Sequence, residues 1–245
     1  MKYNITGTPM PVLNCMLEPN ESMISESGSM SWMSPNMELK TTTNGGVGKV
    51  FSRMISGEKM FQNIYTARNS NGLISFASSF PGDIVALNVT PGQEYLVQKT
   101  GFLAGTQGVD LSVYLQKNIG AGFFSGEGFI LQKISGNGIA FVEVDGSATE
   151  IQLAPGQQII IDTGHLVLAE GTCDIDVKSV KGIKNALFGG VGVFNTVVTG
   201  PGKVVLQSMP IIKMANVISK YIKAPSSSSS SGSSGTKIIN SLIND

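Results

Sequence analysis

The chain has 245 residues, a length that one large β domain or two average domains would fill. Charged residues make up only 14% of it, against about a quarter in ordinary soluble proteins. Because 17 basic residues balance 17 acidic ones, no overall basic field attracts a nucleic-acid backbone. We therefore expect no nucleic acid among the partners, and a low-charge surface that copies of the same chain cover in part.

The start of the chain, MKYNITG, lacks the basic and apolar regions of a secretory signal. No stretch approaches the roughly 18 uninterrupted apolar residues of a membrane span, so we expect a cytoplasmic protein. The only cysteines, Cys15 and Cys173, are too few and too far apart for a disulfide scaffold, and neither belongs to a CxxC pair. Both are expected to be buried free thiols.

Residues 1–43 alternate apolar and polar side chains in short runs, which is the periodicity of β-strands. The expected strands are Val12–Leu17, Ser22–Ser25, Met30–Met33 and Met37–Lys40. The only tryptophan, Trp32, lies in the third of these runs with methionines around it. Such surroundings indicate either an adaptable corner of the core or a surface that awaits a partner, and the core is favoured.

A polar corner centred on proline occurs three times. It reads LEPNE at 17–21, VTPGQ at 89–93 and LAPGQ at 153–157, so its prolines are 72 and then 64 residues apart. Proline followed by glycine or asparagine is typical of a tight turn between strands. The corner therefore marks equivalent points in a repeated unit.

A hairpin pattern recurs at nearly the same spacing. It begins at Gly57, Gly126 and Gly190, which are 69 and then 64 residues apart, and an apolar residue follows each glycine four positions later. Small residues nine and ten positions after each glycine indicate a tight turn. A further glycine then opens the returning strand, at Gly72, Gly138 and Gly202. Two independent markers give one period and predict three tandem β units.

The repeats imply a single β domain followed by a tail that cannot bury apolar surface. The expected division is a domain over 1–223 with repeats at about 17–88, 89–152 and 153–216, a Ser-rich flexible linker at 224–235 and a short tail at 236–245.

The most concentrated group of ligating side chains lies in the third unit. Asp162, His165, Asp174 and Asp176 fall within 15 residues, and a metal site would need at least three of them to converge. A lone histidine beside a Thr-Gly turn favours a hydrogen-bonded structural residue instead. Any Ser-His-Asp or Cys-His mechanism would have to use His165, and no nucleophile elbow accompanies it. We therefore expect no catalytic residues, no metal and no cofactor.

One amphipathic helix is expected, over Ile211–Lys223 after Pro210. Its apolar face consists of Ile211, Met214, Ala215, Ile218, Tyr221 and Ile222, and its opposite face carries lysines. Packing on the β body or on a second subunit is the favoured role. The alternative is a basic helix that lies on an anionic membrane surface.

Three segments carry a resemblance to a known family. They are FPGDIV at 80–85, GAGFFSGEGFILQ at 120–132, and GIKNALFGG at 182–190 with TGPG at 199–202 and LQS at 206–208. Over roughly residues 5–222 the chain resembles the altered-inheritance-of-mitochondria family of bacterial and mitochondrial proteins. The resemblance implies an all-β fold, a double-stranded β-helix or β-barrel-like body with three internal repeats in pseudo-threefold arrangement. It also implies a fold like the tryptophan RNA-binding attenuation protein.

The family's molecular activity is poorly defined, and this chain departs from its pattern at Val191, where a glutamate matching Glu58 and Glu127 is expected. A role for three equivalent acids is therefore not expected. We expect a non-enzymatic, homo-oligomeric assembly or scaffold protein, with peripheral membrane contact through Ile211–Lys223 as a further hypothesis. The alternative is a β-barrel protein that binds a small ligand. RNA binding by analogy of fold is less favoured, because the chain is neutral and only 7% aromatic.

Overall fold

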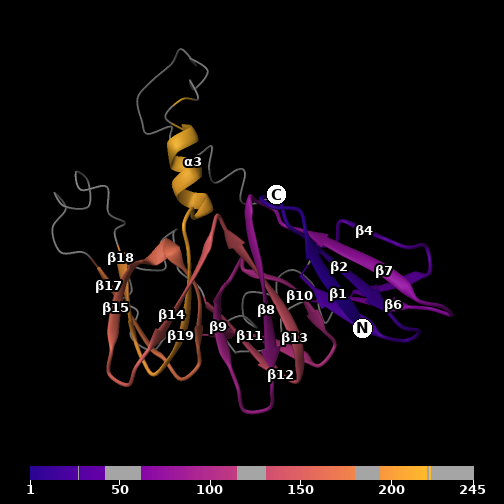
Figure 1. Ribbon diagram of the computed structural model, residues 1–245, viewed down its shortest axis with the longest axis horizontal. Coiled ribbons are helices and arrows are strands. Elements are labelled where there is room, and N and C mark those ends of the chain that lie inside the picture. Colours follow the sequence, from indigo (N-terminus) through magenta and orange to yellow (C-terminus); the bar gives the residue numbers. More distant parts are fainter. Residues whose placement is uncertain (27, 42–61, 115–130, 180–193, 220, 222–245) are drawn as a thin grey trace, which may run out of the picture.

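The computed structural model describes residues 1–26, 28–41, 62–114, 131–179, 194–219 and 221. Nearly all regular structure in these ranges is β-strand, and one helix, α3 (Ile211–Ser219), lies near the C-terminal end. A short 3-10 turn, η2 (Thr163–His165), precedes one strand of the third unit. The all-β class with a short C-terminal helix is confirmed (Figure 1).

Three units of six strands follow one another along the chain. The first unit contains β2 (Val12–Leu17), β3 (Ser22–Ser25), β4 (Trp32–Met33), β5 (Met37–Thr41), β6 (Asn63–Ala67) and β7 (Gly72–Ala77). The second contains β8 (Gly82–Val89), β9 (Tyr95–Gln98), β10 (Phe102–Thr106), β11 (Val109–Tyr114), β12 (Leu131–Gly136) and β13 (Gly138–Asp145). The third contains β14 (Ala148–Leu153), β15 (Gln158–Asp162), β16 (Leu166–Glu170), β17 (Asp174–Ser179), β18 (Phe194–Thr199) and β19 (Gly202–Gln207).

The strands pair in the same antiparallel pattern in every unit. The first and third strands each pair with the sixth, and the second and fourth each pair with the fifth. The three tandem units predicted from the spacing are therefore present. The observed units begin five to seven residues before the expected starts at 17, 89 and 153. The reason is that β2, β8 and β14 precede the proline corners but pair with strands that come after them.

The repeated corners adopt one conformation. Asn20, Gly92 and Gly156 follow the three prolines and have φ values of 69°, 86° and 76°. In each corner the amide two positions after the proline donates to the carbonyl of the residue before the proline, at 2.9 to 3.0 Å, as Gln93 N does to Thr90 O at 2.9 Å. A proline followed by a left-handed residue is the signature of a type II turn, and this explains why glycine or asparagine occupies the position.

Neighbouring units share their sheets. Each unit splits into two halves, and the second-strand half of one unit joins the third-strand half of the next through the pairs β3–β10 and β9–β16. The result is two six-stranded sheets, β5-β6-β3-β10-β13-β8 and β11-β12-β9-β16-β19-β14. At the ends lie β1-β2-β7-β4, which includes the unforeseen strand β1 (Lys2–Thr6), and β15-β18-β17.

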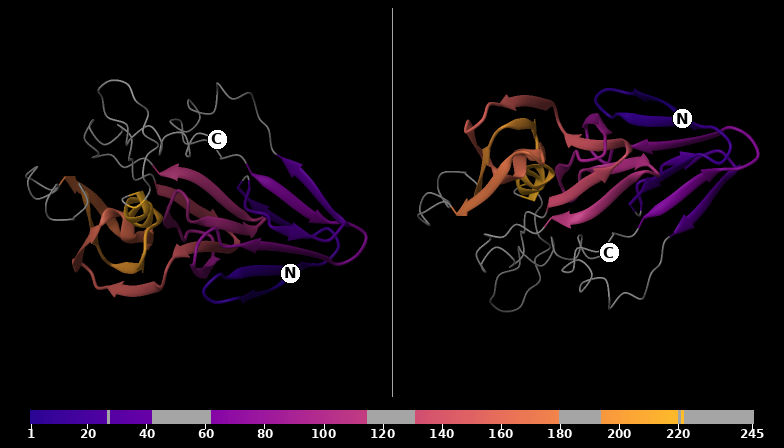
Figure 2. Two further views of the ribbon diagram at one scale, coloured as in Figure 1. Left: turned by 90° about the horizontal axis from the view of Figure 1, so that it is seen from above. Right: turned by 90° about the horizontal axis from the view of Figure 1, so that it is seen from below.

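The three units stand in a row with the first and third at opposite ends (Figures 1 and 2). Within the described ranges, β4 pairs only with β7 and β15 pairs only with β18. The expectation of a β-barrel-like body is therefore corrected in one respect: the described strands do not form a closed barrel, because the edges that would have to meet lie at opposite ends of the row (Figure 1).

Three apolar clusters fill the row, one for each unit, and each includes side chains from a neighbour. Phe141 of the second unit packs in the cluster of the first, with Leu13 and Phe76. Leu96 of the second unit packs in the cluster of the third. The units are thus held together by shared cores as well as by shared sheets.

The structure also corrects the expectation that Trp32 lies in the core. This side chain does not fill the core but is 49% exposed on β4. The neighbouring Met30 and Met33 are partly buried against the first cluster. Trp32 instead lies half in solvent on β4, a strand that pairs only with β7 among the described residues.

Candidate functional site

The strongest polar cluster joins the base of α3 to the third unit. Lys213 forms an ion pair with Asp162, Nζ to Oδ2 at 2.7 Å, and its Nζ lies 2.7 Å from Nε2 of His165. The other ring nitrogen of His165, Nδ1, lies 2.6 Å from the carbonyl oxygen of Gln207. Because a carbonyl only accepts, Nδ1 carries the proton and Nε2 accepts from the ammonium group. His165 is therefore held by hydrogen bonds at both ring nitrogens.

Gln207 extends this cluster into the interior. Its Nε2 donates to the carbonyl of Gly164 at 2.8 Å, and its Oε1 accepts from the backbone amide of Asp145 at 3.0 Å. The carboxylate of Asp145 then accepts the amide of Ile211, the first residue of α3, at 3.0 Å. The first N–H groups of a helix have no partner within it, so a carboxylate at this place caps the helix and complements its dipole. The cluster fixes how α3 leaves the β body.

The metal hypothesis for the third unit is not supported by the arrangement of its residues. Asp162 and His165 meet only through Lys213, whose positive charge occupies the place that a cation would take. Asp176 forms an ion pair with Lys178 on the same strand, β17. In the part of the chain that the structure describes, no three His, Cys, Asp or Glu side chains gather in a way that could hold a metal ion. The residues at Glu58, Glu127 and Val191 lie outside the described residues.

Three partly or fully buried acids escaped sequence reasoning. Burial raises the pKa of Glu26, Glu143 and Asp145 above the usual carboxyl range, and hydrogen bonds to each carboxylate oppose that rise. Glu143 accepts the amide of Ser79 at 2.8 Å, and Glu26 accepts Nε2 of Gln132 at 2.6 Å. All three act as acceptors between strands or units, and their partners lie so far away in the sequence that no local pattern marks them.

Both cysteines are buried free thiols, as predicted. Burial raises the pKa of Cys15 to about 12, and burial together with the charge of Glu170 raises that of Cys173. A thiol that stays protonated is a poor nucleophile and a poor metal ligand. Neither side chain is suited to covalent catalysis.

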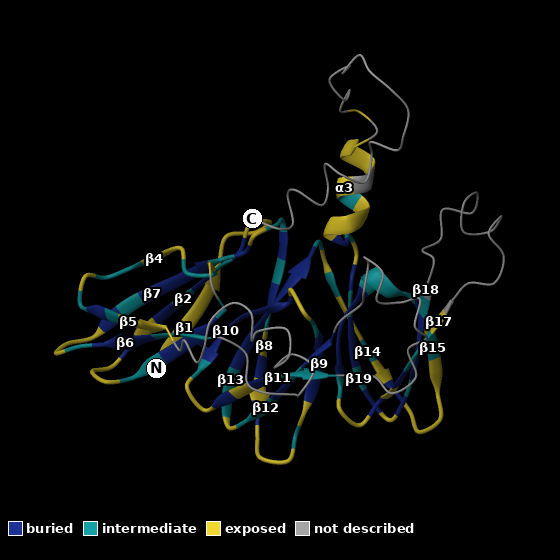
Figure 3. Ribbon diagram, turned by 180° about the vertical axis from the view of Figure 1, so that it is seen from behind, coloured by how far each residue is buried: buried dark blue, intermediate teal, exposed yellow. Residues whose placement is uncertain are grey.

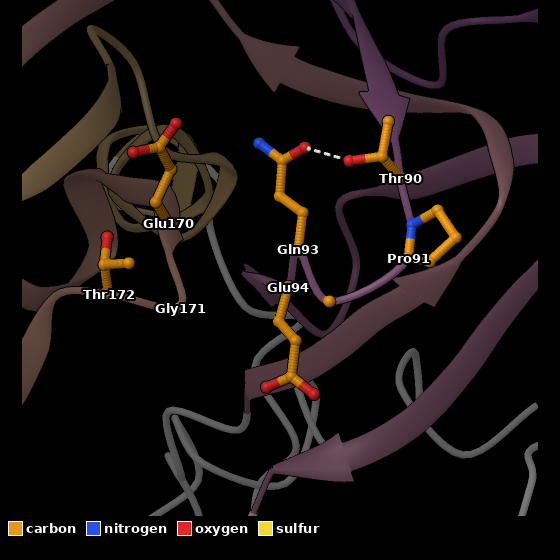
Figure 4. Close-up of a pocket in the computed structure, with 8 residues that line it drawn as sticks. Thr90, Pro91, Gln93, Glu94, Glu170, Gly171 and Thr172 are labelled. Atoms are coloured by element: carbon orange, nitrogen blue, oxygen red, sulfur yellow. Dashed lines mark hydrogen bonds between the residues drawn. The ribbon is translucent and has the colours of Figure 1, made fainter.

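One hollow of about 450 Å³ lies at the junction of the second and third units (Figure 4). The corner Thr90–Glu94 forms one wall and the turn Glu170–Thr172 forms the other. Its carboxylates are already engaged: Glu94 pairs with Lys133 at 2.9 Å, and Glu170 accepts the amide of Lys203 at 2.9 Å. Only Gln93 and Glu170 of the lining are even half-buried, so the hollow is open to solvent.

The cap on α3 can be tested by substitution. Asp145→Ala removes the acceptor for the amide of Ile211, so we expect a loss of about 1 to 2 kcal/mol in the free energy of unfolding, measured by urea titration. Asp145→Asn keeps a side-chain oxygen in place and is expected to lose less than about 0.5 kcal/mol at neutral pH. Equal losses in the two variants would show that the carboxyl oxygen does not cap the helix.

These features define an all-β protein of three tandem units that share sheets and cores. The chain belongs to the mitochondrial biogenesis AIM24 family, whose pattern it matches over residues 3–209. No curated protein matches it. A crystal structure of the protein SPYM3_0169 from Streptococcus pyogenes is similar, with a TM-score of 0.76 and 27% identity over 90% of this chain and 99% of the other. The relation to the fold of the tryptophan RNA-binding attenuation protein stays a prediction.

Proposed function

We propose that the chain is a non-enzymatic assembly protein that works as a homo-oligomer. The observation that carries this proposal is the number of large apolar side chains at the surface of a low-charge protein. Those at least 40% exposed are Tyr3, Met10, Met16, Trp32, Leu39, Ile160, Ile211, Ile212, Val217, Ile218 and Tyr221. A protein that works alone has little reason to keep so many of them in water, whereas a subunit interface would cover them.

Helix α3 supplies the densest group of these side chains. It stands away from the β body, and its surface is exposed almost throughout (Figure 3). Ile211 is 51% exposed, Val217 54% and Ile218 46%, so these described residues of α3 do not pack on the β body. A second subunit is the favoured occupant of this helix, because Lys213, which would meet lipid phosphates, is already paired with Asp162.

Membrane contact through Ile211–Lys223 is the second hypothesis for the same helix. Within the described ranges, no helix is both long and apolar enough to cross a bilayer. Contact would therefore be peripheral, with the apolar face of α3 lying at the lipid surface. We also propose a cytoplasmic location, since Cys15 and Cys173 are unpaired thiols and suit a reducing compartment.

Binding of a small ligand is the alternative function, and the hollow between the second and third units is where it would occur. The engaged carboxylates and the solvent-exposed lining of this hollow favour assembly over ligand binding. RNA binding has less support, because the chain is neutral overall and offers few aromatic rings for stacking.

Light scattering and vesicle flotation test the proposal directly. By light scattering, we expect the full chain to be a homo-oligomer at micromolar concentration. In flotation with anionic vesicles, we expect weak or no binding both for the full chain and for a chain truncated after residue 210. A monodisperse monomer would contradict the assembly function. Strong flotation that disappears on truncation would assign α3 to the membrane instead of a subunit.

A further inference from the structure

The two junctions between units use the same register. At the first, Gly105 of β10 lies opposite Ile24 of β3; at the second, Ala169 of β16 lies opposite Leu96 of β9. The next pairs follow suit, as Thr106 lies opposite Met23 and Glu170 opposite Tyr95. Each junction thus joins the third strand of one unit to the second strand of the unit before it.

Pairing within the units identifies the equivalent positions on the two strands at the ends of the row. Met33, Gly105 and Ala169 are equivalent, because each pairs with the residue two places after the glycine that opens the sixth strand. Ile24, Leu96 and Ile160 are also equivalent. Each pairs with the residue seven positions after the glycine that begins its hairpin pattern, and these partners are Ile64, Lys133 and Val197. At one end of the row the outer strand is β4, which is the third strand of its unit. At the other end it is β15, which is the second strand of its unit. The outer edges of these strands are equivalent to the edges that pair at the internal junctions.

The exposed fractions of equivalent side chains show that these two edges are less covered than the edges at the internal junctions. Ile24 and Leu96 are 2% and 3% exposed at the internal junctions, but Ile160 is 69% exposed. On the other edge, Ala104 and Leu168 are fully buried, whereas the equivalent Trp32 is 49% exposed. The same positions that a neighbouring unit buries are apolar and in water where the row ends.

The two edges also lack lysine and arginine, the side chains that most discourage strand pairing. The residues of β15 are QIIID, and those of β4 with its flanks are SWMS, so neither contains lysine or arginine. Other outer strands do carry such charges, as β5 does with Glu38 and Lys40 and β17 with Asp176 and Lys178. The one acidic residue of these two edges, Asp162 of β15, is paired with Lys213.

We propose that the β15 edge of one copy pairs antiparallel with the β4 edge of the next copy. The register repeats that of the internal junctions, with Met33 opposite Ile160 and Trp32 opposite Ile161. Ile160 then packs over Met30 and Met33, which already lie against the core of the first unit. This inference rests on the proposed assembly function and specifies its interface. The contact joins two different surfaces, so repetition gives a closed ring or a filament in which sheets run from chain to chain.

Two variants that each block one edge test the inference. Ile160→Glu places a charge on the β15 edge, and Trp32→Glu places one on the β4 edge; both sites are exposed, so folding is expected to survive. By light scattering, each variant alone is expected to have the mass of one chain, 25.8 kDa. An equimolar mixture is expected to have twice that mass, because each variant supplies the edge that the other has lost. Thr149→Glu, at an exposed position of the outer strand β14, is the matched control and is expected to keep the wild-type mass.

The outcomes separate this interface from the proposed function. If the wild type is an oligomer and the two edge variants keep its mass, the edge pairing is wrong and the assembly function stands. If both variants are monomers but their mixture gives no dimer, the pairing of these two edges with each other is wrong. If the wild type is itself a monomer, both the interface and the assembly function fail. Thermal unfolding followed by circular dichroism confirms that each variant is folded.

Discussion

Replacing Phe141 by alanine is expected to lower the free energy of unfolding by about 3 to 5 kcal/mol. Phe141 is fully buried, and its ring meets that of Tyr3 edge to face at a centroid distance of 4.8 Å. It comes from β13 of the second unit but packs in the cluster of the first. The cavity would therefore weaken both the first core and the contact between two units.

Denaturant titration followed by tryptophan fluorescence measures this effect, since Trp32 lies in the first unit. Tyr221→Ala is the matched control, because it removes a ring of similar size that is 84% exposed, and we expect a change below about 0.5 kcal/mol. A loss of less than about 1 kcal/mol for Phe141→Ala would mean that the second unit does not help to stabilise the first core.

Replacing Gln132 by leucine is expected to destabilise the protein by about 2 to 3 kcal/mol at pH 8. Gln132 is fully buried, and its Nε2 donates to Oε1 of Glu26 across the boundary between the first and second units. Without this donor, the carboxylate of Glu26 would keep its desolvation cost but lose its nearest hydrogen bond. Leucine fills a similar volume, so the loss reports mainly on the polar contact.

The destabilisation is expected to depend on pH. Burial already raises the pKa of Glu26, and removal of the Gln132 donor raises it further. A carboxyl group with a raised pKa favours folding most when it is protonated, below its pKa in the unfolded chain, and this contribution is lost as the pH rises through the pKa of the folded state. We therefore expect Gln132→Leu to lose about 1 kcal/mol at pH 4.5 and the larger amount at pH 8.

A double variant supplies the control for this pair. Glu26→Leu combined with Gln132→Leu removes both polar partners, and we expect it to be more stable at pH 8 than Gln132→Leu alone. Its difference from the wild type should also vary less with pH than that of the single variant. A loss for Gln132→Leu that is the same at both pH values would show that the contact does not act through the charge of Glu26.

The local structure was predictable where it depends on nearby residues. The strand Val12–Leu17, the start of the helix at Ile211 and the burial of Cys15 follow from alternation, a proline stop and residue type, and all three are confirmed. The three units were predictable because turn residues recur with one period. The glycine and asparagine corners show why, since only a few residue types adopt their left-handed backbone at low cost.

The arrangement of the units was not predictable in the same way. A repeat in the sequence fixes the strands of each unit, but closure depends on the rotation between units, which no periodicity encodes. Trp32 illustrates the point: the equivalent Ala104 and Leu168 are covered by a strand of the preceding unit, whereas β4, which carries Trp32, pairs only with β7 among the described strands. The contact between Glu26 and Gln132 joins residues 106 positions apart, so it leaves no local pattern either.

Each six-stranded sheet takes half its strands from one unit and half from the next. The sheet formed where two repeats meet, here called a seam, is therefore the structural unit of this fold. Cutting the chain between repeats would expose a seam, so a lone repeat is not expected to fold as an independent piece. Gene duplication can nevertheless lengthen such a chain, since an inserted repeat creates one more seam of the same kind and leaves both termini of the row unchanged. Chains with two or four repeats would present the same pair of outer strands and are therefore expected to be compatible with this one.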